Sequence, residues 1–165
     1  MRVFLFYIFL GILIGAACKC PNKTTQISSQ SLTSSMIRQG IKGKVLLVYG
    51  NQMPSPSNTG KKNSSDNAYP TTVFFYEPTN INQVIQENLG PLFNSINTKL
   101  VCSIKTDSTG AFIAALPVGT YSVFVQVDKL FFANNFDSRN NISLVLVEPN
   151  KLTEIKVIVN NNATY

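Results

Sequence analysis

The chain of 165 residues contains no histidine and no tryptophan, and only 13% of its residues are charged. Without imidazole there is no Ser-His-Asp or Cys-His catalytic arrangement and no histidine ligand for zinc. The sequence also lacks a nucleophile elbow, a Gly-rich phosphate loop and an HExxH motif. Its eight carboxylates are scattered along the chain. Asp107 is better explained as a turn residue, whose side chain accepts hydrogen bonds from the nearby backbone, than as a catalytic acid or base. We therefore expect a protein that is not an enzyme and needs no cofactor or metal.

Basic charge is present but is not concentrated anywhere. The chain has 14 Lys and Arg against 8 Asp and Glu, which gives a formal net charge of +6. The longest basic run is the Lys61-Lys62 pair, and no basic helix is predicted. This distribution is typical of a solvated surface and favours no nucleic-acid partner.

The N-terminal segment does not look like part of a globular fold. Arg2 precedes an apolar run over 3–14, and the small residues 15–17 follow before Cys18. A membrane-spanning helix needs about 20 apolar residues, so this run is too short for a lone transmembrane anchor. We predict that residues 1–17 are a secretory signal peptide.

The small residues before Cys18 resemble a bacterial lipobox, although Gly15 stands where a Leu is usual. The resemblance implies cleavage before Cys18 and attachment of a lipid to its sulfur. The expected product is a lipoprotein of the bacterial cell envelope, anchored in the outer membrane, and a plain secreted protein is the alternative.

Three cysteines are present, at positions 18, 20 and 102. Cys18 is assigned to the lipid, Cys20 lies in the predicted tether and Cys102 lies on one face of a predicted strand. Export would permit a disulfide between the last two. We favour instead a free Cys102 that packs as a small apolar residue.

The rest of the chain is predicted to be a tether at 18–40 and one all-β domain at 41–165. Residues 18–40 are rich in Ser, Thr, Gln and Lys without apolar periodicity, as in flexible linkers. In the domain, apolar alternation and β-branched or aromatic runs predict seven strands and no confident helix. These strands cover 41–49, 71–77, 99–106, 111–116, 121–125, 142–148 and 152–160.

Two turns frame the centre of the pattern, at 107–110 and at 117–119. Alternation on both sides of the second turn predicts a core centred on Phe112, Leu116, Tyr121 and Val123.

Irregular segments are expected between these strands. Residues 51–69 are rich in Pro, Gly, Ser and Asn and are predicted to be disordered and dispensable for folding. Residues 80–97 are predicted to be a crossover loop with one helical turn near 82–87, and 129–141 a second irregular segment. The last two strands are expected to pair through a hairpin turn at 149–151.

Four stretches together resemble a carboxypeptidase regulatory-like domain, and the match covers 41–165. They are Ile-Lys-Gly-Lys-Val-Leu at 41–46, Gly-Asn-Gln-Met-Pro at 50–54, Thr-Asp-Ser-Thr-Gly-Ala-Phe at 106–112 and Leu-Pro-Val-Gly-Thr-Tyr-Ser-Val-Phe at 116–124. The stretch 130–137 and the closing residues look like a version found in small surface lipoproteins of Bacteroidota-type bacteria. The resemblance implies a single seven-stranded Greek-key β-sandwich of the prealbumin type, which in this superfamily is usually a structural, stabilising or binding module.

Two functions follow as hypotheses. The first is a structural or protein-binding module of the envelope, which acts through a sheet face or an edge strand. The second is a carbohydrate- or peptide-binding accessory protein of a nutrient-uptake system, with Tyr49, Tyr76 and Phe132 as exposed, ligand-facing aromatics.

Two further clusters have competing explanations. The three phenylalanines in 131–136 are either an aromatic platform or a plug at the open end of the sandwich, and we favour the plug. Asp137, with Asn residues around it, is either a weak Ca²⁺ site or a turn, and we favour the turn because only one carboxylate is present.

Overall fold

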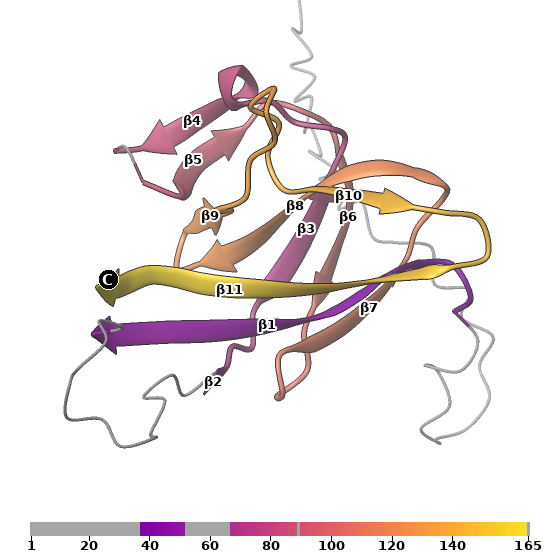
Figure 1. Cartoon of the computed structure of the whole chain (residues 1–165), viewed down its shortest axis with the longest axis horizontal. Coiled ribbons are helices and arrows are strands. Elements are labelled where there is room, and N and C mark those ends of the chain that lie inside the picture. Colours follow the sequence, from indigo (N-terminus) through magenta and orange to yellow (C-terminus); the bar gives the residue numbers. More distant parts are fainter. Residues whose placement is uncertain (1–36, 52–66, 89, 165) are drawn as a thin grey trace, which may run out of the picture.

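A computed structural model describes residues 37–51, 67–88 and 90–164, and it confirms the predicted all-β sandwich. Two sheets, of four and seven strands, face each other (Figure 1). The number of strands was predicted wrongly, because the described residues form eleven strands rather than seven. The predicted signal peptide at 1–17 and most of the predicted tether lie outside the described residues.

The first sheet is built around β1 (Gly40–Asn51), the longest strand of the N-terminal half. β1 pairs in parallel with β11 (Leu152–Thr164), and the two strands run side by side in Figure 1. On its other edge β1 pairs antiparallel with β7 (Ala111–Ala115) and with the short β2 (Asn67–Ala68). The first and last long strands of the described domain are therefore neighbours in one sheet.

The second sheet is antiparallel and is centred on β8 (Gly119–Val127), which pairs with β3, β9 and β10. The strand order is β4-β5-β9-β8-β3-β6, and β10 pairs with β8 outside this path. The bounds of these strands are β3 (Thr72–Tyr76), β4 (Val84–Glu87), β5 (Leu92–Ile96), β6 (Leu100–Lys105), β9 (Leu130–Phe132) and β10 (Leu144–Val147).

The main core lies between the two sheets and confirms the core predicted from the sequence. Phe112, Leu116, Tyr121 and Val123 are all buried there, beside apolar side chains from β1, β3 and β11. Tyr121 also donates a hydrogen bond from its hydroxyl to the carbonyl oxygen of Pro117 (3.0 Å). β1, β7 and β11 supply alternate residues to this core, as expected for a sheet with one buried face.

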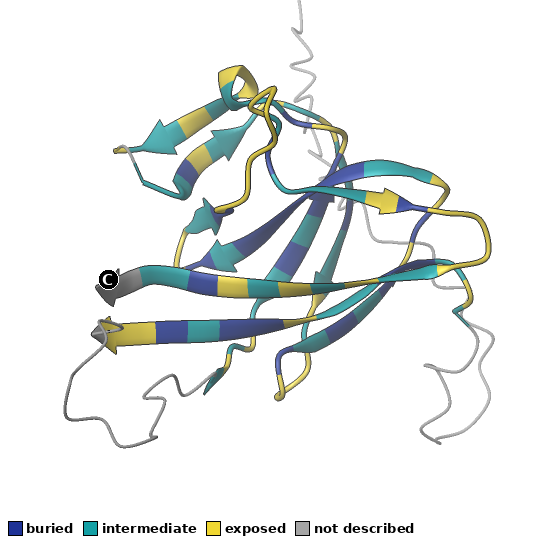
Figure 2. Ribbon diagram, in the orientation of Figure 1, coloured by how far each residue is buried: buried dark blue, intermediate teal, exposed yellow. Residues whose placement is uncertain are grey.

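A second core covers the other face of the second sheet. It is an aromatic cluster in which four pairs of rings meet edge to face, with centroids 5.1–6.2 Å apart. Its rings belong to Phe74, Tyr76, Phe93, Phe124 and Phe131. Strands β3 and β8 are thus covered on both faces, and Figure 2 shows buried residues along both of them. This double burial explains why their sequences are nearly continuous apolar runs without alternation.

Three predicted irregular segments contain strands. The expected crossover loop at 80–97 is a short 3-10 helix (Ile81–Gln83) followed by the β4–β5 hairpin. Asn88 in its turn has a φ of 50°, a left-handed conformation that asparagine tolerates. The segment 129–141 contains β9, and residues 67–69 of the expected disordered loop form β2 and a tyrosine packed on the core. Residues 52–66 lie outside the described residues.

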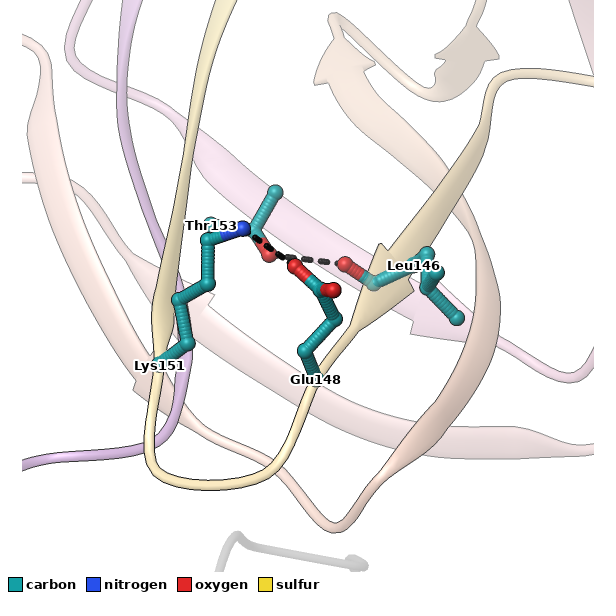
Figure 3. A network of polar contacts seen from close by, with 4 residues as sticks. All are labelled: Leu146, Glu148, Lys151 and Thr153. Atoms are coloured by element: carbon teal, nitrogen blue, oxygen red, sulfur yellow. Dashed lines mark hydrogen bonds and ion pairs between the residues drawn. The ribbon is translucent and has the colours of Figure 1, made fainter.

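The predicted final hairpin is wrong, because β10 and β11 belong to different sheets. The turn at 149–151 carries the chain across from one sheet to the other (Figure 3). A hydrogen bond from Thr153 Oγ1 to the Leu146 carbonyl oxygen (2.7 Å) and an ion pair between Lys151 and Glu148 hold this crossing. The turn between β7 and β8 also joins the two sheets, so strands adjacent in the sequence do not pair there.

Candidate binding groove

An open groove of about 930 Å³ lies on the first sheet, mostly on the face that points away from the main core. Alternation along β1 places Lys42, Lys44 and Leu46 on this face, because Ile41 and Val45 point into the core. We call it the lysine groove. Among the described residues it is lined by Lys42, Gly43, Lys44, Leu46, Ile104, Lys105, Asp107, Ala111, Phe112, Ile113, Glu154, Ile155 and Lys156.

Strand register brings the walls of the groove together from distant parts of the sequence. Lys42 lies opposite Glu154 on β11, and Lys44 lies opposite Lys156. On the other side of β1, the same two lysines lie opposite Ile113 and Ala111 of β7. Lys105 is the last residue of β6 and Asp107 lies in the turn between β6 and β7, at the side of the groove. The groove therefore combines a partly apolar floor with four lysines.

The charges of the groove are only partly compensated within it. Lys42 forms an ion pair with Glu154 at 3.0 Å, across the β1–β11 register. The next pair along the same strands, Lys44 and Lys156, brings two positive charges to directly opposite positions. Among the described residues that line it, four lysines stand against two carboxylates, which gives this part of the groove a net positive charge.

Gly43 lies between the two lysines along β1, but alternation places it on the face that points into the core. A Cβ built on Gly43 would lie 2.3 Å from the Ile155 carbonyl oxygen and 2.9 Å from Phe112 Cζ. No side chain fits there without a shift of backbone. The absence of a side chain thus lets the Phe112 ring pack against β1 directly.

The Asp107 turn at the side of the groove confirms the prediction that Asp107 is a turn residue. Its Oδ1 accepts hydrogen bonds from the backbone N–H groups of Thr109 (2.8 Å) and Ala111 (2.9 Å) and from the Thr109 hydroxyl (2.7 Å). The Thr109 hydroxyl is the main cause that lowers the pKa of Asp107 below its usual value. Gly110 closes the turn with a φ of 75°.

The Asp137 segment is built in the same way, so the turn predicted there is also confirmed. Asp137 Oδ1 accepts hydrogen bonds from the N–H groups of Arg139 and Asn141, both at 2.8 Å, and Oδ2 accepts one from the Asn141 side chain. The Asn141 side chain is the main cause that lowers the pKa of Asp137. In the part of the chain that the structure describes, no three Cys, Asp or Glu residues gather closely enough to hold a metal ion.

The three aromatics predicted to face a ligand do not form a common surface. Phe132 is fully buried in the main core, and Tyr76 is only 7% exposed within the aromatic cluster. Their predicted exposure is wrong, because both strands that carry them are covered by other parts of the chain. Tyr49 is 56% exposed, but it does not line the lysine groove.

The neighbouring phenylalanines are divided between core and surface. Phe131 packs against Phe74 with ring centroids 5.1 Å apart, whereas Phe136 is 41% exposed. Phe131 and Phe132 lie on β9, between β5 and β8 in the second sheet, so the three rings form neither the predicted loop that plugs an open end nor a common platform.

Cys102 is disulfide-bonded, so the prediction of a free thiol is wrong. Its side chain is buried on β6, and its partner lies outside the described residues. Burial on one face of a strand suits a free thiol and a disulfide equally, so the sequence pattern around Cys102 could not separate the two. Cys18, the predicted lipidation site, also lies outside the described residues.

The lysine groove was not recognised in the sequence as a site. A local signal exists in Lys-Gly-Lys at 42–44, which places two lysines on one face of a strand. Lys105 and Lys156 join them only through long-range strand pairing, and no spacing in the sequence indicates that.

The comparisons with known proteins leave the family open. No protein-family model matches the chain, and no curated protein matches it either. Across 37–51, 67–88 and 90–164, no helix has both the length and the apolar character needed to cross a membrane.

Proposed function

We propose that this protein is a non-enzymatic lipoprotein of the cell envelope whose β-sandwich binds another protein through the lysine groove. The observation that carries the proposal is the groove itself, a hollow of about 930 Å³ on the surface of the sheet. Its volume is in the range of ligand sites in proteins, although an open groove suits a segment of chain better than an enclosed small molecule. The resemblance to a carboxypeptidase regulatory-like domain points to the same class of function.

The carbohydrate-binding alternative has less support. A sugar-binding surface built on Tyr49, Tyr76 and Phe132 would need all three rings at the surface, and two of them are buried. Of the described residues that line the groove, only Phe112 is aromatic, and its side chain is buried in the core.

Photo-crosslinking in the cells that produce the protein tests the proposed function. A benzophenone amino acid placed at Ile113, in the groove, should capture one partner protein. The matched control is Val118, which is 54% exposed in the turn after β7 and does not line the groove. The proposal fails if Ile113 gives no adduct, or if both positions give the same adducts.

The lipid anchor belongs to the proposal and has its own test. Mass spectrometry of the mature protein should find a lipid-modified Cys18 at the N-terminus, and Cys18→Ser should release the protein from membranes. The chain has only three cysteines, so a lipidated Cys18 would leave Cys20 as the partner of Cys102. Peptide mapping without reduction should then recover a peptide that contains Cys20 disulfide-linked to one that contains Cys102. A link between 18 and 102 would contradict lipidation of the Cys18 sulfur.

A further inference from the structure

We propose that the lysine groove binds an extended, acidic peptide segment of its partner. This inference rests on the proposed function and names the chemistry of the segment that the groove accepts. Four of the chain's 14 basic residues line this one groove, and two of them lie directly opposite each other on β1 and β11. A ligand carboxylate placed beside Lys44 and Lys105 would meet two exposed positive charges of the groove.

The two carboxylates of the groove are already engaged. Glu154 is paired with Lys42, and Asp107 accepts three hydrogen bonds from its own turn, while the nearby Lys44 charge also helps to lower the pKa of Asp107. Lys44 and Lys105 are both exposed at the groove, where an incoming anion can reach them. The local field therefore attracts acidic segments and disfavours basic ones.

The arrangement of apolar and charged side chains favours a peptide over an acidic sugar chain. Leu46, Ala111 and Ile113 share the face that carries the lysines, so apolar and cationic positions lie next to one another across three strands. A peptide in extended conformation that alternates acidic and apolar residues would match both kinds of position. An acidic polysaccharide offers charge but no apolar side chains for this floor.

Charge also argues against occupants from the protein itself. Residues 19–36 contain two lysines and no acidic residue, and 52–66 contain Lys61, Lys62 and one aspartate. Neither segment has the negative charge that the groove attracts. A second copy of the chain has a formal net charge of +6 and would be repelled as well.

Fluorescence anisotropy with two labelled peptides tests the inference on the complete mature chain. The probe is an eight-residue peptide of alternating Glu and Val with blocked ends, and the matched peptide has Gln in place of Glu. We expect the Glu peptide to bind at least tenfold more tightly, and its affinity to fall as salt is raised from about 50 to 500 mM, since salt screens exposed charges. Equal binding of both peptides overturns the inference.

Charge variants then locate the binding. Lys44→Glu combined with Lys105→Glu should weaken the Glu peptide at least tenfold, and the Gln versions of both changes should weaken it less. The control is Lys129→Glu, an exposed lysine outside the groove, which should change the affinity by less than twofold. An equal loss in the control means attraction by net charge alone and refutes the site. All three lysines are exposed, so we expect every variant to fold. Circular dichroism melts check this.

Two further outcomes would also overturn the inference. One is binding of polygalacturonate to the groove more tightly than the Glu peptide, with the same loss in the double variant. The other is self-association in sedimentation that the double variant removes. If the Ile113 crosslink persists while the acidic peptide does not bind, the proposed function stands and only the acidic character of the partner fails.

Discussion

Truncation of Phe112 to alanine is the most direct test of the packing between the two sheets. Phe112 is only 7% exposed, its ring packs on the bare backbone of Gly43, and it lies 6.1 Å from the Phe75 ring. Loss of a buried Phe side chain usually costs about 3–5 kcal/mol of unfolding free energy. We expect the upper half of this range, because Gly43 has no side chain that could move into the space left behind. A single domain is stable by about 5–15 kcal/mol, so Phe112→Ala should leave it marginal or unfolded.

Urea denaturation followed by circular dichroism measures this loss, as a shift of the midpoint at unchanged slope. The control is Lys156→Ala, an exposed side chain on the other face of the first sheet, which should cost within about 0.5 kcal/mol. A loss below about 1.5 kcal/mol for Phe112→Ala would refute the reasoning, as would equal effects of the two changes. Either result would mean that β7 does not present Phe112 to the core.

Three other changes test separate parts of the structure. Gly43→Ala should lower the free energy of unfolding in urea by about 1–3 kcal/mol, because its Cβ would meet the Ile155 carbonyl oxygen. The control Gly90→Ala should leave the unfolding free energy unchanged, because the nearest atom to its Cβ would be 3.9 Å away. Tyr76→Ala should cost about 3–5 kcal/mol by removing a ring of the aromatic cluster, and a harmless change would mean that this ring is not packed. The lowered pKa values of Asp107 and Asp137 mean that both carboxylates stabilise the fold above their unfolded pKa, and that this contribution is lost as the pH falls through their folded pKa values. Below about pH 4 the melting temperature of the native protein should therefore fall more steeply than that of the Asp107→Asn, Asp137→Asn double variant, and parallel curves would contradict the two turns.

The seven strands predicted from the sequence all exist, because their apolar runs and flanking turn residues are local signals. The β4–β5 hairpin was missed because the apolar residues of this segment, at 81, 84, 85, 89, 92 and 93, recur at helical spacing and do not alternate as in a strand. Asn88 and Gly90 are the signals that indicate its turn. Pairing was predicted less well than strand position, since short turns such as 117–118 and 149–151 can either form a hairpin or cross between sheets.

The candidate site was the part that sequence reasoning handled worst. Tyr76 and Phe132 looked available because aromatic residues in strands alternate between faces, but both faces of the second sheet are covered. The lysine groove depends on the parallel register of β1 and β11, which joins residues more than 100 positions apart. No local pattern carries that information.

The parallel pairing of β1 and β11 also determines how the domain bears mechanical load. Gly40 lies beside Leu152 and Asn51 lies beside Thr164, so both strands begin at one end of the pair and finish at the other. A pull that holds Gly40 and draws Thr164 away acts along both strands and loads their ladder of hydrogen bonds in shear. In shear the bonds share the force and must break together, whereas a pull across the strands would open them one at a time. A domain held at its N-terminal end and pulled at its C-terminal end would therefore resist force through its longest strand pair.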